Sequence, residues 1–248
     1  MTTIVTGGTK GIGLAIAERL AQPGKPLLLV YHADDAAAEA ALARLKPTGA
    51  DVRIVRADVG EIDGAARVME AAAGLDDDPL RLVHSAATIY PTSLLDADLT
   101  RFTAAIQVNG LSLLYLVQKA LPLLGRGSGV VFISSAGART QLANYAALGA
   151  GKALAESLLR YLVAELAPRG VRINAVAPGL VDTGSVAGMV GGREAAERML
   201  ERSARANPSG RLSRDADYAA MVEFLLSPEA EFVQGQVIHV NGGAYVAP

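Results

Sequence analysis

The 248-residue sequence contains no cysteine and no tryptophan, and only 3 of its residues are histidine. Without cysteine, the protein cannot use a disulfide, a thiolate nucleophile, a cysteine-ligated zinc ion or a cysteine-ligated iron–sulfur cluster. His32, His84 and His239 are isolated in the sequence and lack the paired spacing of zinc ligands. We therefore expect no metal site, and a chemistry that uses hydroxyls, amides, lysine, carboxylates or a bound cofactor.

Charge is also scarce, because only 19% of the residues are charged and the net charge is −2. Such a balance argues against a basic surface for nucleic acid. The apolar run 111–124 is interrupted by Gln118, Lys119 and Pro122, and is shorter than the roughly 18–20 residues of a transmembrane helix. No basic segment or cleavage signal precedes the first apolar run. We expect no nucleic-acid partner, no membrane partner and a cytoplasmic location.

Short runs of valine, isoleucine and leucine alternate with longer alanine-rich stretches along the whole chain. This alternation is typical of a parallel sheet that is covered by helices on both faces. We expect strands at 3–6, 27–31, 51–57, 80–84, 130–134, 171–176 and 237–240, and helices at 12–24, 35–46, 61–73, 99–124, 146–167, 193–206 and 215–226. The sequence therefore predicts an α/β protein with one doubly wound (Rossmann) domain over residues 1–248 and a seven-stranded parallel sheet.

The segment 182–214 departs from this rhythm, because it begins with several glycines and continues with six arginines among fewer acids. One interpretation is a mobile substrate lid with a basic outer face. The other is a solvated helix between two loops.

A glycine-rich stretch connects the first expected strand to the first expected helix. Glycines let the backbone turn sharply and approach a pyrophosphate, and a helix N-terminus offers free N–H groups to it. A glycine string alone is weak support, but this position in an alternating chain predicts dinucleotide binding. The expected cofactor contacts here are Gly7, Thr9, Lys10, Gly11, Ile12 and Gly13.

The end of the second strand distinguishes the two nicotinamide cofactors, because an acid there binds the ribose hydroxyls of NAD. This strand ends in Tyr31, an expected cofactor contact, and His32, and Lys10 stands in the glycine loop, so NADPH is favoured over NADH. Asp34 and Asp35 follow closely, and their simpler interpretation is the cap and first turn of the next helix. Asp58 and Val59, after the third strand, are expected near the adenine, although Asp58 could equally cap a helix.

Several further motifs follow in a fixed order: His84-Ser85-Ala86-Ala87, Asn109, Ile133-Ser134-Ser135, Tyr145, Lys152 and Pro178-Gly179. With the glycine string Thr6–Gly13, they resemble the short-chain dehydrogenase/reductase family from Thr6 to Gly243. The resemblance implies cofactor contacts at Ala86, Ala87, Lys152, Pro178, Gly179, Val181 and Thr183. His84-Ser85 replaces the two asparagines of the family's Asn-Asn-Ala-Gly element. We interpret His84 as a structural hydrogen-bonding residue rather than a proton shuttle.

One departure is informative, because the family's pattern is Tyr-x-x-x-Lys and Leu148 stands four residues before Lys152. The available tyrosine is Tyr145, seven residues before the lysine. Seven helical residues turn by about 700°, so both side chains would share a face, separated by about 10 Å along the axis instead of about 6 Å. The tyrosine is displaced by roughly one helical turn.

This displacement suits the reduction of an α,β-unsaturated thioester, in which the hydride adds to Cβ and charge develops on the distant thioester oxygen. The Tyr-x6-Lys spacing resembles the bacterial enoyl-[acyl-carrier-protein] reductases, and a serine ten residues before the tyrosine resembles their third type. That resemblance implies fatty acid biosynthesis, NADPH and a trans-2-enoyl thioester. In it, Tyr145 stabilises the enolate oxygen, Lys152 holds the nicotinamide ribose, Ser135 lines the pocket, and Asn109 supports a link behind the lysine. Ser134 is the alternative to Ser135.

Two other functions remain open. The first is a carbonyl or 3-ketoacyl reductase, in which Tyr145 still reaches the usual position of the acid. The second is a non-catalytic NADP-binding protein, suggested by the altered asparagine element and the missing Tyr-x-x-x-Lys pattern. The family resemblance also implies a homotetramer. The thiol carrier of the acyl group, an acyl-carrier protein or coenzyme A, stays open.

Overall fold

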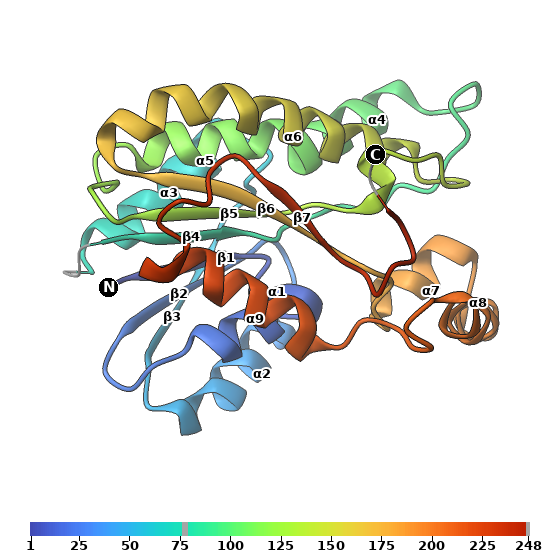
Figure 1. The fold of residues 1–248 in the computed structure, drawn as a ribbon, viewed down its shortest axis with the longest axis horizontal. Coiled ribbons are helices and arrows are strands. Elements are labelled where there is room, and N and C mark those ends of the chain that lie inside the picture. Colours follow the sequence, from blue (N-terminus) through green and yellow to red (C-terminus); the bar gives the residue numbers. More distant parts are fainter. Residues whose placement is uncertain (76–78, 247–248) are drawn as a thin grey trace.

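Seven parallel strands form the centre of the protein (Figure 1). The structure is a computed structural model that describes residues 1–75 and 79–246. The strands lie in the order β3-β2-β1-β4-β5-β6-β7, which confirms the predicted sheet. The order in which strands are added to the sheet reverses between β1 and β4. The carboxyl ends of these two strands therefore form the crevice in which such folds bind ligands. The strands are β1 (Thr3–Thr6), β2 (Pro26–Tyr31), β3 (Asp51–Arg56), β4 (Arg81–His84), β5 (Gly129–Ile133), β6 (Arg172–Pro178) and β7 (Val237–Val240).

Helices cover both faces of the sheet. Successive strand residues point to opposite faces, so Ile4 packs into one apolar core and Val5 into the other. One face is covered by α3 (Ile62–Ala73), α4 (Leu99–Ile106), α5 (Ser112–Ala120) and α6 (Ala146–Leu166). The other face is covered by α1 (Gly11–Leu20), α2 (Asp35–Leu45) and α9 (Asp215–Leu226).

Two features differ from the elements expected from the sequence. The helix expected at 99–124 is divided, because a π-helical segment, Gln107–Leu111, lies between α4 and α5. A short helix, α7 (Gly184–Val190), precedes α8 (Arg193–Ala206) in a stretch where glycines favoured a loop. Within the described ranges, no helix combines the length and apolar character needed to cross a membrane.

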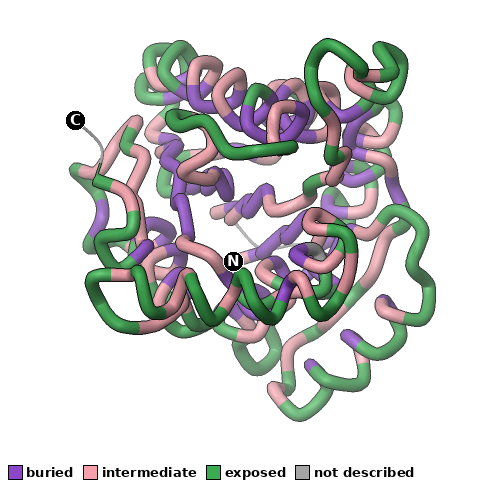
Figure 2. The backbone as a smooth tube through the Cα atoms, turned by 90° about the vertical axis from the view of Figure 1, so that its right-hand side faces the viewer, coloured by how far each residue is buried: buried purple, intermediate pink, exposed green. Residues whose placement is uncertain are grey.

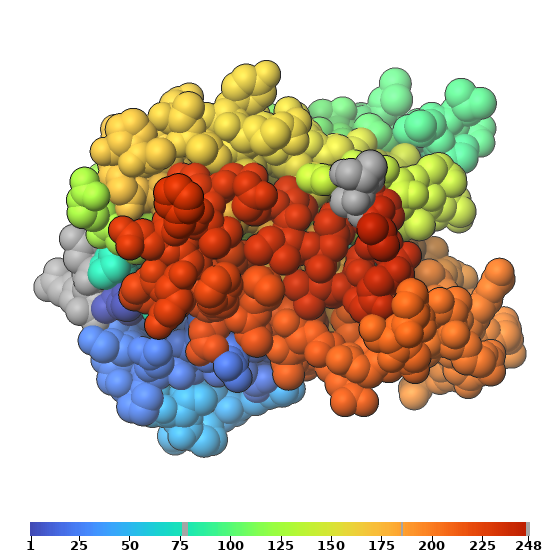
Figure 3. Space-filling view, viewed as in Figure 1, coloured from blue at the N-terminus to red at the C-terminus, as the bar shows by residue number. Residues whose placement is uncertain are grey.

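The segments that follow β4, β5 and β6 lie together at one end of the molecule (Figures 1 and 3). Viewed toward that end, exposed segments form a rim around the buried strands (Figure 2). In a parallel sheet this is the end at which the carboxyl ends of all the strands meet. The predicted site residues are therefore expected at this rim.

Candidate active site

The glycine loop between β1 and α1 is packed so closely that side chains would not fit. A Cβ atom on Gly13 would lie 2.1 Å from the carbonyl oxygen of Gly7, and one on Gly7 would lie 2.8 Å from the Cα of Ala86. Gly7 and Gly11 also have positive φ angles of 64° and 54°. No side chain caps the first N–H groups of α1. The loop therefore offers a close backbone approach and free donors to a pyrophosphate.

Basic and acidic side chains alternate around the end of β2. Asp34 caps α2 by accepting a hydrogen bond from the Ala37 N–H (3.0 Å), which confirms the simpler interpretation of this residue. Its carboxylate also accepts a bond from Lys10 Nζ at 3.0 Å, and this bond is the main cause of its lowered pKa. Tyr31 ends β2 and His32 follows it, so no acid stands at the end of the strand, and Arg56 donates to the carbonyl oxygen of His32 (3.0 Å).

Asp58 forms a turn after β3 rather than a helix cap. Its Oδ1 accepts a hydrogen bond from the Gly60 N–H at 2.9 Å, and the N-cap of α3 is Glu61. Val59 is buried beside it. The helix-capping alternative for Asp58 is therefore wrong, and a contact between Asp58 and an adenine stays a prediction.

Tyr145 is the N-cap residue of α6 and lies beside Ser135, another residue predicted to act in catalysis. Its hydroxyl lies 3.0 Å from Ser135 Oγ. Asn144, just before it, is in the left-handed region with φ 58°, a turn that asparagine tolerates better than most residues. A Cβ atom on Gly137 would lie 2.4 Å from the Tyr145 ring, so the glycine lets the ring lie flat against the loop. Burial raises the pKa of Tyr145 above its usual value, and the hydrogen bond to Ser135 offsets part of this rise.

The two neighbouring serines, Ser134 and Ser135, point to different partners. Ser135 Oγ accepts a hydrogen bond from the Gly137 N–H at 3.1 Å and also meets Tyr145. Ser134 is buried and donates to Glu156 at 2.6 Å. The structure therefore places Ser135, and not Ser134, beside the tyrosine.

Lys152 is buried on α6, two turns after Tyr145. Its Nζ donates to the carbonyl oxygen of Ile133 (2.7 Å) and lies 4.4 Å from the centroid of the Phe132 ring. Burial lowers the pKa of Lys152 to about 7. Leu148, which stands at the family's usual tyrosine position, is buried and apolar, so it offers no proton.

Asn109 fixes the backbone beside the lysine from within the π-helical segment. Its amide accepts from the Thr88 N–H and donates to the Thr88 carbonyl, both at 2.9 Å, and lies 3.4 Å from the carbonyl of Ala147. A Cβ atom on Gly151 would lie 2.5 Å from the Asn109 Cβ, so this glycine permits the contact. Asn109 therefore joins the segment after β4 to the start of α6. π-Segments inside α-helices are frequent at functional sites.

His84 is fully buried and hydrogen-bonded at both ring nitrogens, as expected for a structural residue. Nδ1 lies 2.6 Å from Thr6 Oγ1, and Nε2 lies 2.6 Å from Ser112 Oγ. Because Ser112 donates to the Val108 carbonyl (2.6 Å), its oxygen is free to accept from Nε2–H. Burial lowers the pKa of His84 to about 3, so the ring is neutral.

We expect His84 to make the protein less stable in acid. Its folded-state pKa of about 3 lies below the ordinary value of 6.5, so the unfolded chain takes up the proton first and stability is lost as pH falls from 6.5 toward 3. The loss is about 1.4 kcal/mol per pH unit. Urea unfolding between pH 6 and pH 4 should show a shallower decline for His84→Asn than for wild type. The exposed His32 provides the control, since His32→Asn should keep the wild-type slope.

The remaining predicted cofactor residues follow strands at the same end of the sheet. Ala86 and Ala87 follow β4, Pro178 ends β6, and Gly179, Val181 and Thr183 follow it. Thr183 comes close to the glycine loop, because a Cβ atom on Gly11 would lie 3.7 Å from its methyl group. The fold therefore gathers the predicted residues at one edge, and their contacts with a cofactor stay predictions.

The segment 182–214 forms α7 and α8, and most of its arginines have acidic partners. Arg193 contacts Glu197 (3.1 Å), and Arg198 pairs with Glu194 in the same way, one turn apart on α8. Farther along, Arg211 pairs with Asp217 at 2.6 Å. These pairs offset part of the positive charge, and both interpretations of the segment stay open. Movement of the segment as a lid stays a prediction.

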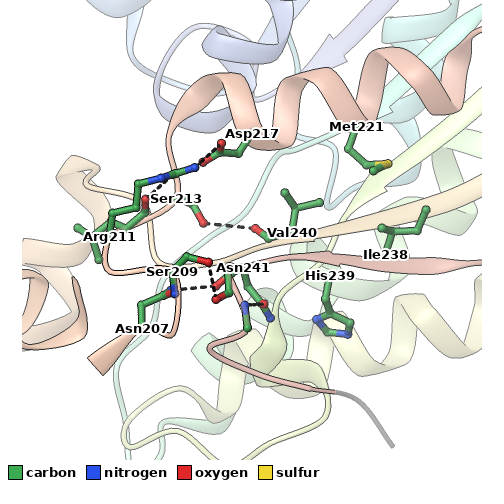
Figure 4. A pocket seen from close by; sticks show the side chains of 13 residues that line it. Asn207, Ser209, Arg211, Ser213, Asp217, Met221, Ile238, His239, Val240 and Asn241 are labelled. Carbon is green, nitrogen blue, oxygen red and sulfur yellow. Dashed lines mark hydrogen bonds and ion pairs between the residues drawn. The ribbon is translucent and has the colours of Figure 1, made fainter. Parts of the chain in front are cut away.

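A cavity of about 340 Å³ lies between α9 and β7 (Figure 4). Several of its polar side chains bind the backbone: Asn207 donates to the Asn241 carbonyl (2.9 Å), and Ser213 to the Val240 carbonyl (3.3 Å). The ring nitrogens of His239, which also lines the cavity, have no hydrogen-bond partner among the described residues. It contains none of the residues predicted from the sequence to act in catalysis. We assign it no role.

Sequence reasoning missed one charged cluster near the site. Glu156 is buried on α6 and binds both Ser134 and Arg139, at 2.6 and 2.9 Å. One signal was available, because Glu156 follows Lys152 by four residues and therefore lies on the same face of α6.

Comparison with known proteins identifies relatives along nearly the whole chain. The family described as "Enoyl-(Acyl carrier protein) reductase" matches residues 7–245. The "Uncharacterized oxidoreductase YmfI" of Bacillus subtilis is 33% identical over 98% of both chains. The "3-oxoacyl-[acyl-carrier-protein] reductase FabG" of Staphylococcus aureus is 31% identical over 99% of this chain and 98% of its own.

Solved structures similar to this one also cover nearly the whole chain. A short-chain dehydrogenase from Burkholderia cenocepacia in complex with NADP superposes with a TM-score of 0.84 and 30% identity, covering 98% of this chain and 97% of its own. The RhlG/NADP active-site complex of Pseudomonas aeruginosa superposes with a TM-score of 0.86 and 27% identity, covering 99% and 96%.

Proposed function

Because this chain belongs to the short-chain dehydrogenase/reductase superfamily of NAD(P)H-dependent oxidoreductases, we propose that it uses NADPH to reduce the 2,3-double bond of an enoyl thioester. The observation that supports this substrate is the seven-residue step from Tyr145 to Lys152. Leu148 fills the position of the usual acid, while the Tyr145 hydroxyl is placed against Ser135 from one turn earlier.

The cofactor cradle fits the proposal, because the Gly7–Gly13 contact leaves no room for side chains where a pyrophosphate would approach. The glycine loop would hold the phosphates, and Ala86, Pro178 and Thr183 would border the nicotinamide half. When bound, NADPH supplies the hydride. The protein supplies position and polarisation.

Tyr145 would donate its hydroxyl proton, or a hydrogen bond, to the thioester oxygen on which charge develops. Ser135 orients that hydroxyl from 3.0 Å away. Lys152 would turn from the Ile133 carbonyl to the ribose hydroxyls and place a positive charge below the site. Asn109 keeps the start of α6 in position through Ala147.

We expect Lys10 to contribute to a preference for NADPH over NADH. Lys10 stands in the glycine loop, and its ammonium reaches Asp34 (3.0 Å), just after the end of β2, where a 2′-phosphate would lie. Removal of one hydrogen bond to a charged group costs about 1.5 kcal/mol, or about tenfold in affinity. Fluorescence titration of Lys10→Ala should show this loss for NADPH and a change below about twofold for NADH. Lys46→Ala, an exposed lysine in a remote turn, should leave both affinities unchanged.

A second candidate function is 3-ketoacyl reduction. The close contact between Ser135 and Tyr145 supports it, since this tyrosine then polarises a carbonyl oxygen at the usual place. The similarity to a 3-oxoacyl-[acyl-carrier-protein] reductase of Staphylococcus aureus also favours it.

Separate steady-state assays distinguish the two. We expect purified protein to oxidise NADPH with crotonyl and longer enoyl thioesters. Turnover of 3-ketoacyl thioesters or ketones without turnover of any enoyl thioester would support the second function instead.

The acyl group is proposed to arrive on an acyl-carrier protein or coenzyme A. We also propose that the protein is a cytoplasmic homotetramer that acts in fatty acid biosynthesis.

A further inference from the structure

Glu156 lies nine-tenths or more buried, outside the set of residues that would touch cofactor or substrate. Its two carboxylate oxygens bind different segments. Oε1 accepts from Ser134 Oγ at 2.6 Å, and Oε2 accepts from Arg139 Nε at 2.9 Å. A buried carboxylate is costly unless its oxygens are hydrogen-bonded, and both are here.

These two partners flank the loop that holds Ser135. Ser134 immediately precedes Ser135, and Arg139 immediately follows the short helical turn Ala136–Ala138. One carboxylate therefore fastens both ends of a loop of four residues to α6. The loop contains the serine that meets Tyr145 and the glycine, Gly137, against which the tyrosine ring packs.

We infer that Glu156 is a positioning residue, which holds the Ser135 loop so that the Tyr145 hydroxyl is aimed at the developing charge. The inference rests on the proposed reductase function. A displacement of about 1 Å in a catalytic group can reduce a rate by as much as about 100-fold. Glu156 also lies one turn after Lys152 on α6. The face of the helix that carries the lysine therefore also binds the loop.

Other ionisable groups face this carboxylate from each neighbouring element. Arg139 approaches from the loop, Lys152 lies one turn earlier on α6, and His239 approaches from β7. Both ring nitrogens of His239 are buried and have no hydrogen-bond partner in the described part of the chain, and burial lowers the pKa of this histidine. Arg139 is thus the cation that directly pairs with Glu156.

The test compares Glu156→Gln with Glu165→Gln, an exposed glutamate on the same helix. For whichever thioester the wild type reduces, we expect Glu156→Gln to lower kcat about tenfold, with the KM and the NADPH dissociation constant changed less than about twofold. The alkaline limb of the pH–rate profile should move to higher pH, because loss of the Ser135 contact removes the bond that lowers the pKa of Tyr145. Glu165→Gln should behave as wild type.

A loss of melting temperature alone does not support the inference. If folded Glu156→Gln keeps the kcat and the pH profile of Glu165→Gln, Glu156 is only a structural residue and the inference is overturned. If Glu156→Gln does not fold, Ser134→Ala takes its place, because it removes the Ser134 contact with Glu156. The same changes in kcat and pH profile are then expected, and their absence overturns the inference.

A readout without turnover separates this inference from the proposed function. Ultraviolet titration of tyrosinate, taken as the difference between each protein and its Tyr145→Phe counterpart, reports the pKa of Tyr145 directly. A higher pKa in Glu156→Gln supports the inference even if the wild type reduces no thioester. An unchanged pKa contradicts it.

Discussion

Replacement of Tyr145 by phenylalanine should lower kcat by about 100- to 1,000-fold while NADPH still binds. The hydroxyl is the group that Ser135 orients from 3.0 Å, and Leu148 cannot replace it as a proton donor. Loss of a positioned acid or of one donor to a developing oxyanion costs a factor of this size. The ring would still pack against Gly137, so the fold should be retained. Steady-state rates and fluorescence titration of NADPH measure the two parts.

Tyr161→Phe is the matched control, because Tyr161 lies on the same helix and is 73% exposed. It should leave the rate and the cofactor affinity unchanged. Activity of Tyr145→Phe within tenfold of wild type would show that the proton or hydrogen bond comes from another group.

Replacement of Lys152 by methionine should separate activity from stability. Methionine keeps the length of the side chain and its apolar packing on Phe132, but it removes the ammonium that would hold the ribose. We expect kcat/KM to fall by at least about 100-fold, the typical effect of losing one preorganised electrostatic contact.

The same variant should unfold at higher denaturant concentration at pH 7. Burial lowers the pKa of Lys152 from 10.5 to about 7, so at or below pH 7 the folded protein bears most of the cost of an almost fully buried charge. The sign follows from proton uptake: between pH 7 and 10.5 the unfolded chain binds more protons, so wild-type stability rises with pH in that window. Removal of the buried charge should add about 1–4 kcal/mol to the free energy of unfolding. Catalytic groups are often held at such a cost.

Lys46→Met, at an exposed lysine, controls for the added methionine and should change neither quantity. Chemical unfolding at several pH values and the initial rates together decide the matter. An active Lys152→Met protein, or one that is less stable than wild type at pH 7, would contradict this role for the lysine.

The sheet was predictable because parallel strands that are buried on both faces are continuous apolar runs. The first and last strands, Thr3–Thr6 and Val237–Val240, begin and end at the expected residues. The division of the helix expected at 99–124 was not predictable, because the π-segment around Asn109 preserves helical composition and changes only the hydrogen-bonding step. Such a change depends on tertiary contacts, here with Thr88 and Gly151.

The site divides in the same way. Motif order along the chain located the tyrosine, the lysine and the glycine loop. It left Ser134 and Ser135 as alternatives, because only the path of the backbone after β5 decides which hydroxyl meets Tyr145. It also missed the bonds of Glu156, since they join residues 17 and 22 positions apart. It also left two interpretations of the arginine-rich segment, because the sequence does not show which arginines pair with acids; Arg193 and Arg198 pair with glutamates one helical turn away.

The most direct test of enoyl reduction is a competition between two thioesters of equal chain length for a limiting amount of NADPH deuterated at the transferred position. Equal concentrations of the 2-enoyl and the 3-keto thioester are mixed with the protein, and mass spectrometry measures deuterium in each product. We predict that the saturated acyl thioester contains most of the deuterium. Deuterium found mainly in the 3-hydroxyacyl thioester would contradict enoyl reduction and identify a ketoacyl reductase.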